Sequence, residues 1–160
     1  MAAESGRELA VGDKAPAFRL PRDGGEWVSL KDFKGRNLVL YFYPKADTAG
    51  CTREAIDFSR LRAEFAKAGT EILGVSADPV PALDKFKTKH RLAIALAADE
   101  SKAMLEAFGA WGEKSMYGRK YWGVLRKTFL IDAQGRIARV WPKVRVPGHA
   151  EEVLAAARAR

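Results

Sequence analysis

Cysteine and histidine are scarce in this chain of 160 residues. Cys51 is the only cysteine, and His90 and His149 are the only histidines. A single thiol excludes a disulfide within the chain and a Cys-x-x-Cys dithiol site, and it is typical of a reducing compartment. We expect both histidines at the surface, rather than in a metal site or beside Cys51 as a nucleophile pair. No Gly-rich phosphate loop is present either, so neither a metal nor a cofactor is expected.

Long apolar runs are also missing. No stretch approaches the ~18 apolar residues of a membrane span, and the N-terminus carries charges where a signal peptide has its apolar segment. With 48% hydrophobic residues, a chain of this length can bury a core of its own. We therefore expect a cytoplasmic protein with one domain over residues 1–160, in which residues 1–10 form a flexible N-terminus.

Acidic residues are rare in the segment 111–147, which carries nine Lys or Arg and only Glu113 and Asp132 against them. The whole chain has a net charge of +8. Aromatic residues interleave with these cations, as in some nucleic-acid-binding surfaces, but no recognition motif accompanies them. The alternative is a basic face that keeps the protein soluble and attracts peroxide or the acidic surface of a partner. The role of this segment stays open.

Apolar patterning predicts an α/β domain. Strands are expected at 38–43, 72–75, 93–97, 124–131 and 137–141, and helices at 54–68, 81–90, 101–108 and from 149 onward. An N-terminal β-hairpin is expected around the turn Asp23-Gly24-Gly25, and a loop rich in Gly, Trp and Tyr before residue 124. Alternating strands and helices followed by an antiparallel pair predict a mixed central sheet flanked by helices.

Cys51 stands where a helix begins behind a strand. The apolar run 38–43 ends at Pro44, and Thr48 is the predicted N-cap, which places Cys51 at the third helical position. Free backbone N–H groups and the helix dipole stabilise a thiolate there. The alternative is that Cys51 is a small apolar residue in a turn.

An enzyme that uses this thiol also needs donors aimed at the charge that moves off sulfur during reaction. The Thr48 hydroxyl can donate one hydrogen bond. Arg126, at the start of the apolar run 127–132, is the candidate for a fixed cation. Its own neighbourhood is equally compatible with a charged residue on the surface of a strand.

The residues around Cys51 resemble a known active-site signature. Pro44-x-x-x-Thr48-x-x-Cys51 resembles that of the peroxiredoxins, and the segment 41–58 is similar to the bacterioferritin comigratory protein, or Q-type, subfamily. The resemblance runs on through 73–76, 99–100, 116–118, 123–132 and 143–149, so it covers nearly the whole chain from Val11. It implies a thioredoxin-like fold and an antioxidant enzyme that reduces hydrogen peroxide and organic hydroperoxides.

The resemblance also implies a role for each site residue. Cys51 would be the peroxidatic thiolate that becomes a sulfenic acid, and Thr48 would hydrogen-bond both peroxide and thiolate. Arg126 would hold the thiolate and the polarised oxygen. Pro44 would shield the pocket. Glu54 would orient the arginine, although it could equally be a dipole partner in the first turn of the helix.

The chain departs from the family pattern in ways that affect turnover. Family members often carry a resolving cysteine five residues after the first, where this chain has Ile56, or in the next helix near Phe86-Lys87. Neither is present, so an external thiol (thioredoxin, glutaredoxin or a small thiol) must reduce the sulfenic acid, unless two Cys51 residues pair between molecules. Ala49 replaces the usual proline and is expected to loosen the loop. The resemblance favours a monomer, with a Cys51-linked dimer as an oxidised form.

Two other classes of function stay open at this point. One is a redox-sensing or chaperone-like binding protein in which oxidised Cys51 forms a mixed disulfide. The other is a basic protein that binds nucleic acid. The pair Asp99-Glu100 fits a loop and helix cap better than an acid/base dyad.

Overall fold

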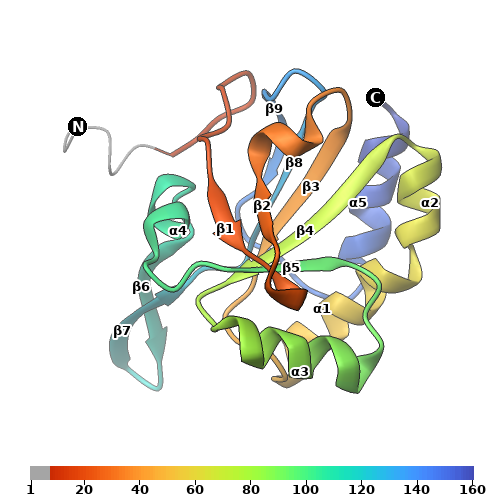
Figure 1. The fold of residues 1–160 in the computed structure, drawn as a ribbon. Coiled ribbons are helices and arrows are strands. Elements are labelled where there is room, and N and C mark those ends of the chain that lie inside the picture. Colours follow the sequence, from red (N-terminus) through yellow and green to blue (C-terminus); the bar gives the residue numbers. More distant parts are fainter. Residues whose placement is uncertain (1–7) are drawn as a thin grey trace.

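A five-stranded mixed sheet forms the centre of the protein, as the computed structural model shows for residues 8–160 (Figure 1). Its strands are β3 (Asn37–Phe42), β4 (Thr70–Ser76), β5 (Ala95–Ala98), β8 (Lys127–Ile131) and β9 (Ile137–Trp141), in the order β5-β4-β3-β8-β9. β3, β4 and β5 run parallel, and β8 pairs antiparallel with both β3 and β9. The predicted mixed sheet and thioredoxin-like fold are confirmed. Most of the predicted flexible N-terminus, residues 1–7, lies outside the described residues.

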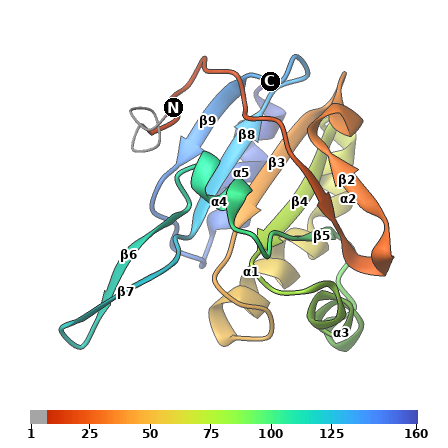
Figure 2. The same cartoon turned by 60° about the vertical axis from the view of Figure 1, so that its left-hand side comes forward.

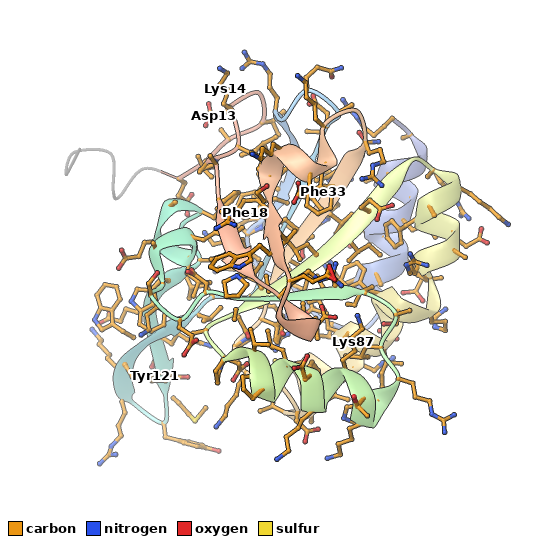
Figure 3. All side chains as sticks on the ribbon, in the orientation of Figure 1. Asp13, Lys14, Phe18, Phe33, Lys87 and Tyr121 are labelled. Carbon is orange, nitrogen blue, oxygen red and sulfur yellow. The ribbon has the colours of Figure 1, made fainter. Side chains whose placement is uncertain are left out.

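Both faces of the sheet are covered, because alternate residues of β3 point to opposite sides. Val39 and Tyr41 belong to a core shared with α1 (Ala49–Arg60), α2 (Arg62–Lys67), α3 (Val80–His90) and α5 (His149–Arg158). Leu40 and Phe42 belong to a second core beneath α4 (Ala103–Ala107) and the N-terminal hairpin. Phe18 is buried in this second core and Phe33 packs against it (Figure 3).

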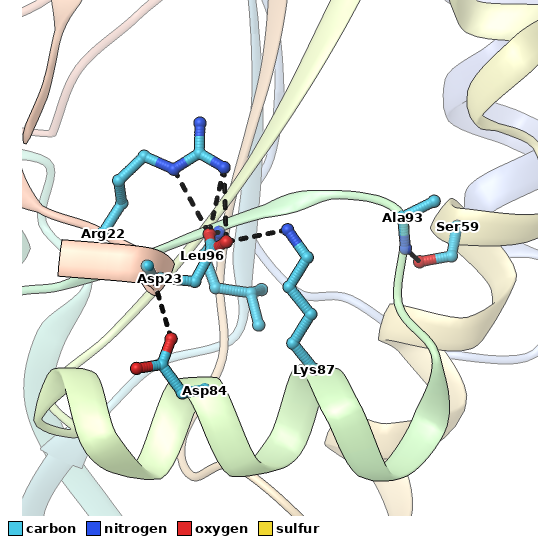
Figure 4. A network of polar contacts seen from close by, with 8 residues as sticks. Arg22, Asp23, Ser59, Asp84, Lys87, Ala93 and Leu96 are labelled. Atoms are coloured by element: carbon cyan, nitrogen blue, oxygen red, sulfur yellow. Dashed lines mark hydrogen bonds and ion pairs between the residues drawn. The ribbon is translucent and has the colours of Figure 1, made fainter. Parts of the chain in front are cut away.

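The predicted N-terminal hairpin is present as β1 (Arg19–Pro21) and β2 (Trp27–Ser29), joined by the short 3-10 helix η2 (Asp23–Gly25). A second 3-10 helix, η3 (Leu30–Phe33), follows β2. Asp23 fixes the hairpin to the body of the protein (Figure 4): its carboxylate accepts hydrogen bonds from Lys87 Nζ at 2.8 Å and from the Leu96 N–H at 2.9 Å. Burial opposes ionisation, but these bonds lower the pKa of Asp23.

The expected loop before residue 124 is instead a second hairpin, and this prediction was wrong. β6 (Trp111–Met116) pairs antiparallel with β7 (Arg119–Val124), and the pair projects from the body of the protein (Figures 1 and 2). Tyr117 and Gly118 form its two-residue turn with φ of 53° and 78°. Positive φ at both positions suits the twist of a tight hairpin, but Tyr is an unusual residue there. Without the usual Asn-Gly or Gly-Gly signal, the turn was not evident from sequence.

The expected strand 124–131 is broken, and the break matters for the site. Val124 ends β7 and Lys127 begins β8. Between them, the Leu125 N–H donates a hydrogen bond to the Ala110 carbonyl at 2.7 Å, which ties the base of the hairpin together. Arg126 therefore lies in a junction rather than in a regular strand.

Two helices also differ from prediction. The helical segment begins after the predicted N-cap Thr48 and was expected to run to residue 68, but it is divided at Leu61 (φ −96°, ψ 2°) into α1 and α2. Phe58 and Phe65 nevertheless remain buried together, with ring centroids 5.9 Å apart. The predicted cap of α4 is displaced by one residue, since Lys102 is the N-cap in a left-handed conformation. Asp99 nevertheless accepts the Leu105 N–H at 2.7 Å, in keeping with the predicted capping pair. No helix within residues 8–160 is long and apolar enough to cross a membrane.

Candidate active site

Cys51 lies in the first turn of α1, directly behind the end of β3. Thr48 is the N-cap residue (φ −92°, ψ 160°), which confirms the predicted third helical position of Cys51. The thiol is almost completely buried, with 1% of the residue exposed. A sulfur in the first helical turn lies near the N-terminus of the helix, where free N–H groups and the helix dipole favour an anion.

The loop between β3 and α1 is held by contacts with α3 and with Asp78, which lies just before α3. The Asp78 carboxylate accepts the Ala46 N–H at 2.8 Å. Asp47, with φ of 63°, receives hydrogen bonds at 2.8 Å from Lys89 Nζ and from His90 Nε2. Pro44 is half-buried at the start of this loop. These contacts fix the backbone that presents Thr48 and Cys51.

The Thr48 hydroxyl does not contact sulfur in this structure. It donates its hydrogen bond to the Lys45 carbonyl at 2.8 Å and makes no capping bond to the helix. The hydroxyl oxygen keeps its lone pairs and can still accept a hydrogen bond from a bound molecule. In this structure the Thr48 hydroxyl proton is therefore used in a hydrogen bond to the backbone, and only the hydroxyl oxygen is available to a bound molecule.

Arg126 connects Cys51 to Glu54. Its Nη2 lies 3.4 Å from Cys51 Sγ, and its Nη1 donates to Glu54 Oε1 at 2.6 Å. The glutamate side chain is 1% exposed and the arginine side chain 20%. The structure therefore brings three of the predicted site residues into one hydrogen-bonded row, in which the guanidinium uses one nitrogen for each partner.

Burial and charge oppose one another in this row. Burial raises the pKa of Glu54 to about 7, although the Arg126 charge and hydrogen bond act in the other direction. Its second oxygen, Oε2, is buried and has no hydrogen-bond partner among residues 8–160. Burial disfavours the charged guanidinium, but the charges of Glu54 and Cys51 outweigh it and raise the pKa of Arg126. The arginine is therefore a permanent cation beside the sulfur.

Gly50 has a part in this geometry that the sequence analysis missed. A Cβ atom built at Gly50 would lie 3.3 Å from Arg126 Nη2, closer than an ordinary van der Waals contact. The guanidinium can therefore approach Cys51 because the preceding residue has no side chain. The only sequence signal was the position of Gly50 directly before the cysteine.

Lys114 is a second cation near the site that was not singled out. Its ammonium donates to the Val124 carbonyl at 2.9 Å across the β6–β7 hairpin, on which Tyr121 also lies (Figure 3). Burial and the Arg126 charge lower the pKa of Lys114, whereas the Cys51 charge raises it. The hairpin thus brings a positive charge to the same side of the protein as the thiol.

The prediction that both histidines are surface residues was wrong for His149, which is 3% exposed. Its Nε2 lies 2.8 Å from Thr128 Oγ1, and its ring packs edge-on against Phe58 and Trp141. Burial lowers its pKa to about 4, so the ring is neutral. His90 is half-buried and bound to Asp47. Among residues 8–160 there is no group of three or more His, Cys, Asp or Glu that could hold a metal ion.

Other residues occupy the positions at which family members often carry a resolving cysteine. Ile56 is 40% exposed on α1. Phe86 is buried in the core of the α1 face, and Lys87 forms the ion pair with Asp23. Phe86 and Lys87 therefore contribute to packing and to the attachment of the N-terminal hairpin.

Comparisons with known proteins identify the family of the chain. The family model described as the AhpC/TSA family matches residues 11–140. The chain is 48% identical over 146 residues to the putative peroxiredoxin Bcp of Coxiella burnetii, covering 91% of this chain and 97% of that protein. It is 45% identical over 146 residues to the peroxiredoxin Bcp of Bacillus subtilis, with coverage of 91% and 93%.

A solved structure of the Xanthomonas campestris bacterioferritin comigratory protein superimposes with a TM-score of 0.85 at 44% identity, covering 89% of this chain and 90% of that one. Sequence, fold and family model lead to the same assignment. The chain belongs to the AhpC/TSA family and is a peroxiredoxin similar to the Bcp and Q-type members.

Proposed function

We propose that the chain reduces hydrogen peroxide and organic hydroperoxides with Cys51 as its single redox-active residue. The contact of 3.4 Å between Arg126 Nη2 and Cys51 Sγ carries this proposal. A buried thiol next to a permanent cation and a helix N-terminus has the surroundings of a reactive thiolate. The Xanthomonas campestris relative has alkyl peroxide reduction activity, which supports organic hydroperoxides as substrates.

In the proposed reaction the Cys51 thiolate attacks one peroxide oxygen, and the O–O bond breaks. Sulfur becomes a sulfenic acid, and the other oxygen leaves as hydroxide or alkoxide and takes a proton from water. Negative charge moves from sulfur to the leaving oxygen. Arg126 can stabilise this charge in the transition state, because its Nη2 already lies 3.4 Å from the sulfur. The Thr48 oxygen can accept the peroxide O–H, and Pro44 limits access of water to the loop.

Glu54 acts in this proposal as a positioning residue. Its hydrogen bond to Nη1 holds the guanidinium in the orientation in which Nη2 faces the sulfur. Within residues 8–160, the only hydrogen bond that the carboxylate forms is with Arg126. The charge and hydrogen bond of Arg126 partly offset the cost of burying the Glu54 carboxylate, so each residue of the pair depends on the other.

Turnover requires an external reductant, because the chain has no second cysteine. A thiol converts the sulfenic acid to a mixed disulfide, and a second thiol releases Cys51. The need to keep Cys51 reduced supports a reducing compartment such as the cytoplasm. The monomer is the proposed working form.

The test is a stopped-flow reaction of the reduced protein with one equivalent of hydrogen peroxide, followed by mass spectrometry. We expect a fast gain of one oxygen, captured by a sulfenic-acid probe and absent in Cys51→Ser. A rate no higher than that of a free thiol would contradict the proposal.

A further inference from the structure

The structure contains a basic groove that Arg126 lines. The groove has a volume of about 670 Å³ and is lined by the cations Arg126, Lys127 and Lys143 and by the apolar side chains of Leu125, Pro142 and Val144. Such a volume is in the range of sites for small molecules. Arg126 lines this groove and also contacts Cys51 Sγ, so the groove and the reactive sulfur share this residue, although Cys51 itself does not line the groove.

Lys127 contributes a cation to the groove that is largely buried and weakly paired. Its side chain is only 9% exposed, yet within residues 8–160 its one ion pair is with Glu8, at 3.7 Å between Nζ and Oε1. That distance is too long for a good hydrogen bond, and the Glu8 side chain is 80% exposed. Within residues 8–160, the largely buried Lys127 side chain therefore has a single loose carboxylate partner for its three N–H donors.

Glu8 shows what kind of group the groove accepts. It lines the groove, so the chain itself already places a carboxylate among these cations. An ion pair of this length whose carboxylate side chain is 80% exposed contributes little free energy. A carboxylate from another molecule can therefore replace Glu8 at small cost and gain the additional charge of Lys143, which is exposed and forms no ion pair within the described residues.

We propose that this groove binds a low-molecular-weight thiol that carries at least one carboxylate, and that this thiol is the reductant of oxidised Cys51. The inference rests on the proposed function. The thiolate of the small molecule attacks the sulfur of the Cys51 sulfenic acid, the S–O bond breaks, and hydroxide leaves as water after taking a proton. A second thiol molecule attacks the mixed disulfide, which releases the Cys51 thiolate and a disulfide of the two small molecules.

The choice of a thiol over a carboxylate-bearing hydroperoxide follows from what the chain lacks. Hydrogen peroxide is neutral and needs no cationic groove, whereas two thiol equivalents must come from outside. The 1% exposure of Cys51 also favours a small molecule, because a protein reductant would require a larger opening around the first turn of α1.

The experiment measures the two half-reactions separately by stopped-flow. Reduced protein is first oxidised with one equivalent of hydrogen peroxide, and the sulfenic acid is then reduced with glutathione or with its diethyl ester, whose carboxylates are neutral. The variants are Lys143→Gln and Glu8→Gln. Lys120→Gln is the matched control, since Lys120 is also an exposed lysine but lies on β7, outside the groove.

We expect Lys143→Gln to slow reduction by glutathione about three- to tenfold and to leave reduction by the diester unchanged. Glu8→Gln should accelerate the glutathione reaction, because it removes the competing carboxylate. Lys120→Gln should behave like the wild type. Ratios of variant to wild type for each thiol remove the difference in intrinsic reactivity between the two thiols.

Three results would overturn the inference. The first is an equal effect of Lys143→Gln on glutathione and on the diester. The second is reduction by a dithiol protein alone. The third is slower oxidation by linoleic acid hydroperoxide in Lys143→Gln with unchanged reduction by glutathione, which would assign the groove to substrate. If the first half-reaction itself is slow with hydrogen peroxide, the proposed function fails instead, so the two failures are distinguishable.

Discussion

The guanidinium of Arg126 lies 3.4 Å from the sulfur of Cys51, although 75 positions separate the two residues along the chain. The contact exists because β3 and β8 are antiparallel neighbours: the carboxyl end of β3 leads to Cys51, and the amino end of β8 follows Arg126. The break between β7 and β8 releases Arg126 from a regular strand and allows its side chain to reach across to α1.

Replacement of this arginine tests its proposed role directly. Arg126→Ala should slow the oxidation of Cys51 by hydrogen peroxide by one to a few decades, which corresponds to about 2–4 kcal/mol for one lost transition-state donor. Stopped-flow measurement on the reduced protein gives the rate. Arg119→Ala, an exposed change on β7, is the control and should react like the wild type. Wild-type speed in Arg126→Ala would remove Arg126 from the mechanism.

Gly50→Ala should separate activity from stability. The new Cβ would lie 3.3 Å from Arg126 Nη2, so the guanidinium must move by a few tenths of an ångström away from its present position. We expect the rate of Cys51 oxidation to fall about three- to tenfold. Because Gly50 lies inside α1, alanine should leave the melting temperature unchanged or raise it. Ala49→Gly, at the neighbouring helical position, should not slow the reaction; a change in Tm without any change in rate would contradict the steric argument.

Glu54 should make the protein less stable as the pH rises. Its folded pKa of about 7 lies above its ordinary value of 4.5, so folding favours proton uptake between these two values. The stabilisation is complete below pH 4.5 and is lost as the pH rises to about 7, with a total of about 3 kcal/mol. Urea unfolding of Glu54→Gln across this range should lack this slope. An identical pH dependence in wild type and variant would show that Glu54 is ionised throughout.

His149 should produce the opposite slope. Its folded pKa of about 4 lies below its ordinary value of 6.5, because the buried ring must stay neutral. Its stabilising effect is therefore present above pH 6.5 and is lost as the pH falls towards 4. In His149→Gln, which can keep the contact with Thr128, the free energy of unfolding should fall less steeply on acidification. His90→Gln is the control. It should keep the pH dependence of the wild type, because the prediction assigns the slope to the buried histidine, His149, alone.

Tyr117→Asn should stabilise the β6–β7 hairpin without affecting catalysis. Tyr117 is 98% exposed and has a φ of 53°, a conformation that asparagine adopts more easily than tyrosine. We expect a gain of about 0.5–1 kcal/mol, seen as slower hydrogen exchange in 111–124. Tyr121→Asn, at a β7 position outside the turn, should not give this gain. Peroxide oxidation of Cys51 should be unchanged in both.

Local sequence was sufficient where local forces decide the structure. The position of Cys51 in α1 depends on a strand, a proline, a capping threonine and a helical pattern, all within about twenty residues, and it was predicted correctly. The turn at Asp23-Gly24-Gly25 was predicted for the same reason. The turn at Tyr117-Gly118 was missed, because tyrosine accepts a positive φ there only within the complete hairpin.

By itself, the sequence determined that the one thiol of the chain stands at a helix start, that no second cysteine is present to form a disulfide with it within the chain, and that a mixed sheet forms the core. Only the tertiary structure decided which charges reach that thiol. Burial and proximity arise when distant elements pack together: this brings Arg126 and Lys114 towards Cys51, pushes the pKa of Glu54 to about 7, and encloses His149 between Phe58 and Trp141. These effects cannot be predicted from a residue's neighbours in the chain, because desolvation and interactions with nearby charges depend on its neighbours in space.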